Sequence, residues 1–135
     1  MRVRWNCAVK TAVYGQADKR ESIMFFLSMV LELTCHKCAP VSLLQHSIFA
    51  HAAVMNLISS IDSILGRKLH DCTRNKPLSL AVVSNHSSRI TLRVSFMGRH
   101  GIQAADALAL ALTRIDTMEL GPYRWQVAGV YCSGC

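Results

Sequence analysis

The chain has 135 residues, of which 51% are hydrophobic and 17% charged, so it can bury a core and is not an intrinsically disordered protein. Its 15 lysines and arginines outnumber 8 aspartates and glutamates, which favours partners that carry phosphate or an anionic surface. No apolar run is long enough to span a bilayer, since residues 23–33 are too few and include Ser28 and Glu32.

The basic N-terminus is not followed by the apolar stretch of a signal peptide, so we expect a cytoplasmic protein whose six cysteines are mostly reduced thiols. Residues 1–23 mix five basic and two acidic side chains with little periodicity. We expect these residues to be an N-terminal extension and residues 24–135 to form a single domain.

Apolar periodicity and turn residues divide this domain into strands and helices. Residues 89–97 alternate most clearly, with arginine, threonine and serine on one face and apolar side chains on the other. Asp62 or Ser63 can cap a short helix, and Pro77 stops helix formation. In chain order we predict a strand at 24–33, a loop at 34–40, a helix at 43–61, a short helix to 69, a strand at 78–83, a turn at 85–88, a strand at 89–97, a loop at 98–101, a helix at 102–115, a turn at 121–122 and a strand at 123–131.

The order strand, helix, strand, strand, helix, strand is typical of the split βαβ arrangement. We therefore predict an α+β, ferredoxin-like (RRM-like) βαββαβ domain. Its four-stranded antiparallel sheet would carry the two main helices on one face and leave the other face free for a ligand or partner. This fold supports many functions, so the function has to be argued from particular residues.

The stretch around Leu69-His70-Asp71 holds the residues most suited to chemistry. A histidine can transfer protons near neutral pH, and a lysine can stabilise negative charge that develops in a transition state. His70 and Lys76 are six residues apart, at the end of a predicted helix and the start of a predicted strand. Together they suit RNA cleavage in which the 2′-hydroxyl attacks its own phosphate, a reaction that needs proton transfers but no metal.

Several segments, in this order, give the chain a resemblance to a known family. They are residues 60–71, Lys76-Pro77-Leu78, residues 91–95, residues 118–121 and residues 127–130. Over about residues 24–131 the chain resembles the N-terminal domain of the CRISPR-associated endoribonucleases of the RAMP superfamily, which process precursor CRISPR RNA. The resemblance implies a metal-independent, cofactor-free ribonuclease that cuts repeat RNA and leaves a 2′,3′-cyclic phosphate.

The resemblance also implies roles for individual residues. His70 falls where members of the family place a catalytic histidine, and Lys76 where some place a lysine beside the scissile phosphate. Some members supply a tyrosine from the first helix, but the corresponding position here is Met55, which cannot give or take a proton. The family usually carries a second ferredoxin-like domain with a glycine-rich loop, so a second RAMP-like domain or chain could complete the protein. Exposed strand edges could also pair with a second copy to form a homodimer.

Basic residues elsewhere are candidates for RNA contact. Those near His70 would hold phosphates, and those on the polar face of residues 89–97 would lie on an RNA-binding sheet, although that face lacks the aromatic residues of a stacking surface. His46, early in the first helix, is a candidate for touching RNA or assisting chemistry, whereas we expect His51 merely to pack or face solvent. The RNA-binding candidates are Arg67, Lys68, Arg74, His46, Arg89 and Arg93.

Two alternatives remain open from the sequence. One is a non-catalytic RNA-binding or assembly module of the same fold. The other is a small interaction protein stapled by zinc, because Cys35 and Cys38 form one CxxC pair and Cys132 and Cys135 another. We nevertheless predict no metal site, since the two pairs are far apart in the chain. No nucleotide-binding glycine motif or carboxylate cluster points to another class.

Overall fold

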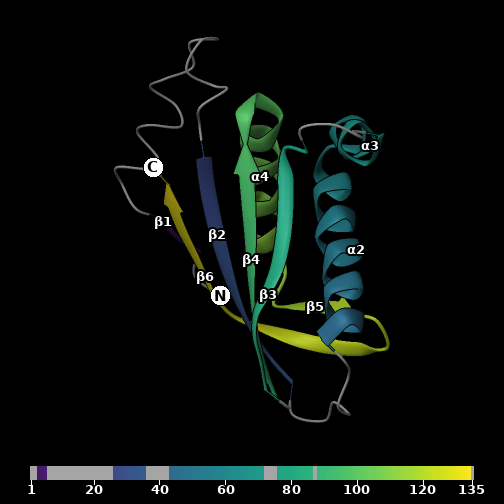
Figure 1. The fold of residues 1–135 in the computed structure, drawn as a ribbon, viewed down its shortest axis with the longest axis vertical. Helices are drawn as coiled ribbons and strands as arrows, with labels where there is room; N and C mark the ends of the chain where they lie inside the picture. The colour runs from purple at the N-terminus through teal and green to yellow at the C-terminus, as the bar shows by residue number, and fades with distance from the viewer. Residues whose placement is uncertain (1–2, 6–25, 36–42, 72–75, 87, 135) are drawn as a thin grey trace.

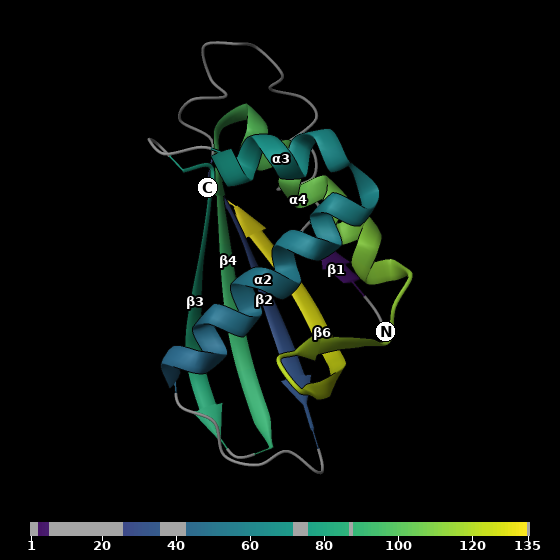
Figure 2. The same ribbon diagram turned by 90° about the vertical axis from the view of Figure 1, so that its right-hand side faces the viewer.

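The structure is a computed structural model that describes residues 3–5, 26–35, 43–71, 76–86 and 88–134. Helices gather on one face of a twisted sheet in both views of the ribbon (Figures 1 and 2). None of the helices in the described ranges is long and apolar enough to span a membrane. The elements, in chain order, are β1 (Val3–Trp5), β2 (Phe26–Thr34), α2 (Leu43–Ile61), α3 (Ser63–Asp71), β3 (Leu78–His86), β4 (Arg89–Met97), α4 (Gly98–Thr113), β5 (Thr117–Leu120) and β6 (Tyr123–Gly134).

The sheet has the strand order β1-β6-β2-β4-β3, with β5 paired to β6. Four of its strands are the predicted ones, and their antiparallel pairing in the order β6-β2-β4-β3 is that of a ferredoxin-like α+β fold. The predicted number of four strands is too low, because β1 pairs parallel to β6 and β5 forms a hairpin with it. These two strands have only three and four residues, too few for alternation to reveal them.

Alternation along the strands separates a buried face from an open face. In β4, four apolar side chains on one face are at most 1% exposed, whereas Arg89 and Arg93 on the other face are exposed. The same alternation in β2 buries Leu27, Met29 and Leu31 beneath the helices. The core therefore lies between the sheet and the helices, and the open face carries mainly polar side chains.

The helices begin and end close to the predicted positions, with one exception. The predicted bounds of 43–61 match α2, and the short helix that follows is α3. The predicted loop at residues 98–101 is wrong, because α4 begins at Gly98. Gly98 and Gly101 suggested a loop on intrinsic propensity, but Gly101 is buried and lies against the Pro77 carbonyl oxygen, where tertiary packing overrides propensity.

Candidate active site and the surfaces around it

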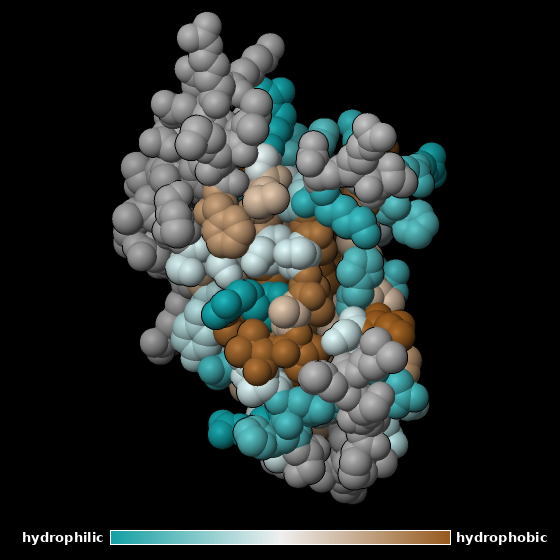
Figure 3. Space-filling model, viewed as in Figure 1, coloured by the Kyte–Doolittle hydropathy of each residue, from teal (hydrophilic) through white to brown (hydrophobic). Residues whose placement is uncertain are grey.

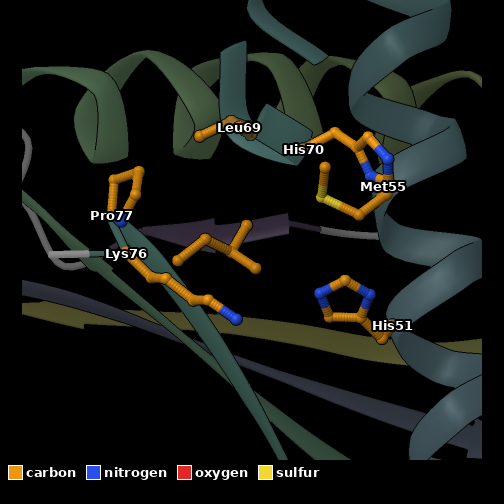
Figure 4. Close-up of a pocket in the computed structure, with 7 residues that line it drawn as sticks. His51, Met55, Leu69, His70, Lys76 and Pro77 are labelled. Atoms are coloured by element: carbon orange, nitrogen blue, oxygen red, sulfur yellow. The ribbon is translucent and has the colours of Figure 1, made fainter. Parts of the chain in front are cut away.

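A pocket of about 260 Å³, here called the His70 pocket, opens where α2, α3 and the start of β3 meet. It brings together His70 and Lys76, the two residues singled out from the sequence, and adds His51 from α2 (Figure 4). In Figure 4 the Lys76 side chain extends across the pocket towards the His51 ring. The pocket is lined by His51, Met55, Leu69, His70, Lys76, Pro77 and Leu78.

Helix geometry explains how α2 and α3 supply their side of the pocket. His51 and Met55 are four residues apart and so share one face of α2. The α3 helix starts at a true cap, because the Asp62 carboxylate accepts a hydrogen bond of 3.0 Å from the backbone N–H of Leu65. A Cβ on Gly66 would collide with the Ser59 side chain, so only glycine lets α3 pack this closely on α2. The last turn of α3, which carries His70, is therefore held in a defined place.

The β3 side of the pocket is fixed from behind by α4. The backbone N–H of Met97 donates a 2.7 Å hydrogen bond to the Pro77 carbonyl oxygen. A Cβ on Gly101 would lie only 2.8 Å from that same oxygen. Leu78, the next residue, is 7% exposed and belongs to the core. Lys76 therefore precedes a residue that is hydrogen-bonded to Met97, the last residue of β4, and packed against the first turn of α4.

The His70 pocket has an apolar floor and a cationic rim. Pro77 and Leu78 are buried, whereas His51, His70 and Lys76 are exposed and within reach of a ligand from solvent. Among the described residues, no acidic side chain lines the pocket. Two imidazoles and an ammonium group around one small opening can transfer two protons and stabilise an anion, which is the set of functions needed to cleave RNA without a metal.

The predicted RNA-contacting cations fall into two groups. Arg67 and Lys68 are exposed on α3, in the helix that ends with the pocket residue His70. Arg74 lies outside the described residues. Arg89 and Arg93 are exposed on the open face of the sheet. Because Arg89 pairs with the last residue of β3, it lies about 26 Å from the strand start that lines the pocket.

A second depression, here called the His86 hollow, surrounds Arg89 on the open face. It has a volume of about 180 Å³ and includes Glu32, His86 and Thr91. The Ser84 hydroxyl donates a 3.2 Å hydrogen bond to the Thr91 hydroxyl there. The strand register shifts beside it in the β2–β6 and β3–β4 pairings, where Ala128 and Val83 are the extra residues, and such bulges re-aim side chains. Of the two predicted cations of β4, Arg89 therefore lines the His86 hollow, whereas Arg93 lines neither the hollow nor the His70 pocket.

His46, a candidate for RNA contact from the sequence, is buried in the structure. Its side chain is 4% exposed, and its ring makes an edge-on contact with Trp125, with centroids 5.8 Å apart. Burial lowers the pKa of His46. Neither His46 Nδ1 nor Trp125 Nε1 has a hydrogen-bond partner among the described residues. The early-helix position suggested access to loops, but the side chain points into the core between α2 and β6.

Sequence reasoning passed over two residues that the structure brings forward. His51 was expected to pack or face solvent, yet it lines the His70 pocket one helical turn before Met55. That spacing was the available signal, because residues four apart on a helix share a face.

Tyr131 of β6 pairs with Val30, which in turn pairs with Arg93, so an aromatic ring that is 42% exposed does lie on the open face. The position of Tyr131 on the open face could not be predicted without the order in which β6, β2 and β4 pair.

The described cysteines do not assemble the zinc site considered from the sequence. Cys132 pairs with Met29, and Cys35 lies six residues after Met29, just past the end of β2, so the two cysteines are about 20 Å apart. Cys35 is disulfide-bonded, and burial raises the pKa of the Cys132 thiol to about 12. Within the described ranges, no group of three or more metal-ligating side chains comes together. Cys38 and Cys135 lie outside the described residues.

Comparison with known proteins places the fold. The sequence matches no protein-family model and no curated protein. Among solved structures, the chain is similar to a Cas6 product complex, with 25% identity and a TM-score of 0.65 over 78% of this chain and 40% of that chain. A RAMP protein described as binding different RNA substrates gives 12% identity and a TM-score of 0.56 over 79% of this chain and 48% of that one. A structure described as CRISPR-associated protein Cas6 gives 15% identity and a TM-score of 0.52 over 80% of this chain and 48% of that chain.

These likenesses confirm the resemblance that the sequence predicted: the chain is Cas6-like and RAMP-like in structure. In each comparison it spans less than half the length of the solved chain. The likeness therefore concerns the fold of this chain, and any activity depends on the residues of the His70 pocket.

Proposed function

We propose that this protein is a metal-independent endoribonuclease that cuts CRISPR repeat RNA in the His70 pocket. The observation that carries the proposal is the convergence of His51 from α2, His70 from α3 and Lys76 from the segment before β3 on one pocket. The similarity to a Cas6 product complex and to a RAMP protein that binds RNA supports RNA as the substrate. A net charge of +7 adds a general attraction for phosphate.

The proposed reaction is an internal transesterification. The ribose O2′ attacks the adjacent phosphorus and forms the O2′–P bond of a 2′,3′-cyclic phosphate, while the P–O5′ bond breaks and releases a 5′-hydroxyl. A general base removes the proton of the 2′-hydroxyl, and a general acid gives a proton to O5′. The number of protons is unchanged, and no water, metal or oxidant is consumed.

Two imidazoles suit the two proton transfers better than one imidazole does. Base and acid act on opposite sides of the phosphorus, so a single histidine does not serve both oxygens in the same step. His51 on α2 and His70 on α3 enter the pocket from different helices and supply one group each. Lys76 donates hydrogen bonds to the non-bridging oxygens, where negative charge grows in the transition state. Arg67 and Lys68 hold phosphates further along the strand.

Product analysis tests this function. Purified full-length protein is incubated in EDTA with end-labelled hairpin RNAs that have randomised single-stranded flanks, together with repeat RNAs from CRISPR loci. We expect cleavage at one defined position, with a 2′,3′-cyclic phosphate on one fragment and a 5′-hydroxyl on the other. Cleavage that requires a divalent metal, or products with a 3′-hydroxyl, would contradict the proposed chemistry.

The assay also separates the alternative of a non-catalytic RNA-binding module. RNA retained on a filter but never cut, with affinity that falls steeply with salt, is the result expected of such a module. Adding a second RAMP-like protein encoded beside the same gene then shows whether a partner chain completes the site.

A further inference from the structure

A second depression adjoins the His70 pocket and shares a residue with it. This depression, here called the Ile48 hollow, has a volume of about 300 Å³ and is lined by Ser47, Ile48, His51 and Leu80. Ile48 precedes His51 by three residues, on the same side of α2. Leu80 follows the pocket residue Leu78 by two, on the same face of β3. The two depressions are therefore successive parts of one groove between α2 and β3.

The walls of the Ile48 hollow differ from those of the His70 pocket. Ile48 is 58% exposed, and Leu80 is half-buried, so the hollow is mainly apolar where the pocket is cationic. Figure 3 shows apolar side chains gathered along β3 beside α2. Strand β3 is the last in the sheet order, so among the described residues its outer edge has no strand partner. An edge strand presents unpaired N–H and C=O groups, which can bond to the polar edge of a flat ring.

An apolar hollow next to a cationic pocket matches the chemistry of a nucleotide, in which a base lies next to a phosphate. A base has apolar faces and a polar edge, and its phosphate is an anion. Ile48 and His51 are separated by about 4.5 Å along the helix axis, comparable with the roughly 3.4 Å axial spacing of stacked nucleotides. A strand whose scissile phosphate lies between the histidines and Lys76 would therefore place its neighbouring base at Ile48.

We propose that the Ile48 hollow binds the base of an unpaired nucleotide next to the scissile phosphate, an inference that rests on the proposed function. The base packs against Ile48 and Leu80, and its polar edge bonds to the free edge of β3. His51 sits at the junction, between the base and the phosphate. The hollow thus positions the RNA strand and contributes to the choice of cleavage site.

Nuclear magnetic resonance of the full chain with labelled isoleucine methyl groups tests the contact without relying on cleavage. The probes are a short single-stranded RNA and the hairpin RNAs with single-stranded flanks. We expect the Ile48 methyl signal to shift on titration with either RNA. Ile64 is a matched control, since it is 68% exposed on α3 and lines none of the three depressions described above. Its signal should shift less than that of Ile48, because its nearest proposed RNA contacts are the phosphate-binding residues Arg67 and Lys68, one turn along α3.

Single-turnover cleavage tests the functional consequence. Removing the base at one nucleotide beside the cleavage site should slow the wild type about tenfold, and Ile48→Ala should slow cleavage of the intact RNA by a similar factor. The two losses should not add, because both remove the same contact. Ile64→Ala should cleave like the wild type.

The two readouts separate the inference from the proposed function. RNA that is cleaved or bound while the Ile48 signal stays unchanged overturns the inference. Binding that shifts the Ile48 signal without any cleavage supports the hollow and overturns the proposed nuclease activity. Cleavage with additive losses from Ile48→Ala and the missing base overturns the shared contact. Absence of any RNA binding at low salt overturns both.

Discussion

The His70 pocket and the His86 hollow both combine a histidine with a cation, yet they are built differently. The pocket is walled by two helices and a strand, and its backbone is fixed by the Asp62 cap and by the Met97 hydrogen bond to Pro77. The hollow lies on the open face of the sheet and contains Glu32, whose carboxylate opposes an anionic ligand. Residue types alone do not distinguish the two sites. The secondary structure that holds each site and the charge around it do.

This comparison assigns the chemistry to the His70 pocket. A general acid or base has to be held within hydrogen-bonding reach of its proton, which favours side chains on anchored elements. An exposed sheet face can still contact RNA, and Arg89 and Arg93 remain candidates for binding without a role in the reaction. Substitutions that change the cleavage rate without changing RNA affinity therefore test whether the two sites have different roles.

The largest expected losses of cleavage rate, equal in size, come from replacing His70 and His51. We expect His51→Ala to slow single-turnover cleavage by about a thousandfold, because it removes one of the two proton-transfer groups. The measurement uses RNA in which sulfur replaces the bridging 5′ oxygen at the cleavage site. A thiolate leaves without a proton, so only the variant that lacks the general acid should recover its rate.

Either His51→Ala or His70→Ala has to show this recovery. A His51→Ala protein as fast as the wild type on ordinary RNA would remove His51 from the mechanism. If sulfur restored neither variant, the proposed division of acid and base between the two histidines would be incorrect.

Lys76 is expected to have the next largest effect. Replacing it with alanine removes the cation proposed to stabilise the transition state, so Lys76→Ala should slow cleavage by about a hundredfold with little change in RNA affinity. Arg89→Ala is the matched control, since it deletes a cation from the His86 hollow. Quench-flow cleavage and filter binding measure the two quantities. An Arg89→Ala variant that loses as much rate as Lys76→Ala would contradict the assignment.

Gly101 tests whether the His70 pocket depends on the packing behind Pro77. Helix propensity alone predicts that Gly101→Ala stabilises the protein by about 1 kcal/mol. The added Cβ would instead meet the Pro77 carbonyl oxygen at 2.8 Å, so we expect a loss of about 1 to 3 kcal/mol in the free energy of unfolding. Urea denaturation gives the sign directly. A stabilised variant would show that this contact is not tight.

The smallest predicted effect is a pH dependence of stability caused by His46. Burial lowers its pKa in the folded protein, whereas in the unfolded chain the imidazole keeps a value of about 6.5. The unfolded state then binds more protons as pH falls below about 6.5, so the stabilising contribution present above that pH is lost.

Thermal unfolding between about pH 5 and pH 7 should therefore show a steeper decline for the wild type than for His46→Leu. The exposed His100 provides the control, because His100→Leu should keep the wild-type slope. Equal slopes for wild type and His46→Leu would contradict the burial of a neutral His46.

Much of the fold could be predicted because its main elements have strong local signals. Residues 89–97 alternate cleanly, and residues 43–61 carry an amphipathic pattern, so both were placed with the observed bounds. The start of α4 was missed because Gly98 and Gly101 oppose a helix locally. In the structure Gly98 has a positive φ of 71°, and Gly101 packs on Pro77. The short strands β1 and β5 depend on pairing with β6, which no local pattern reveals.

The candidate site was predictable where chemistry was concentrated in a short stretch of sequence. His70 and Lys76 are six residues apart, and the structure brings both to one pocket. His51 and His46 lie on the same helix, and their roles depend on which face meets the core, a matter of tertiary packing. The placement of Arg89 about 26 Å away likewise required the strand register.

The most direct test compares His70→Ala with His86→Ala in single-turnover cleavage of hairpin RNA in EDTA, with affinity measured in parallel. Our account predicts that His70→Ala loses about a thousandfold in rate while its affinity stays near that of the wild type. His86→Ala should cleave normally. Full activity of His70→Ala, or an equal loss in both variants, would contradict the assignment of the reaction to the His70 pocket.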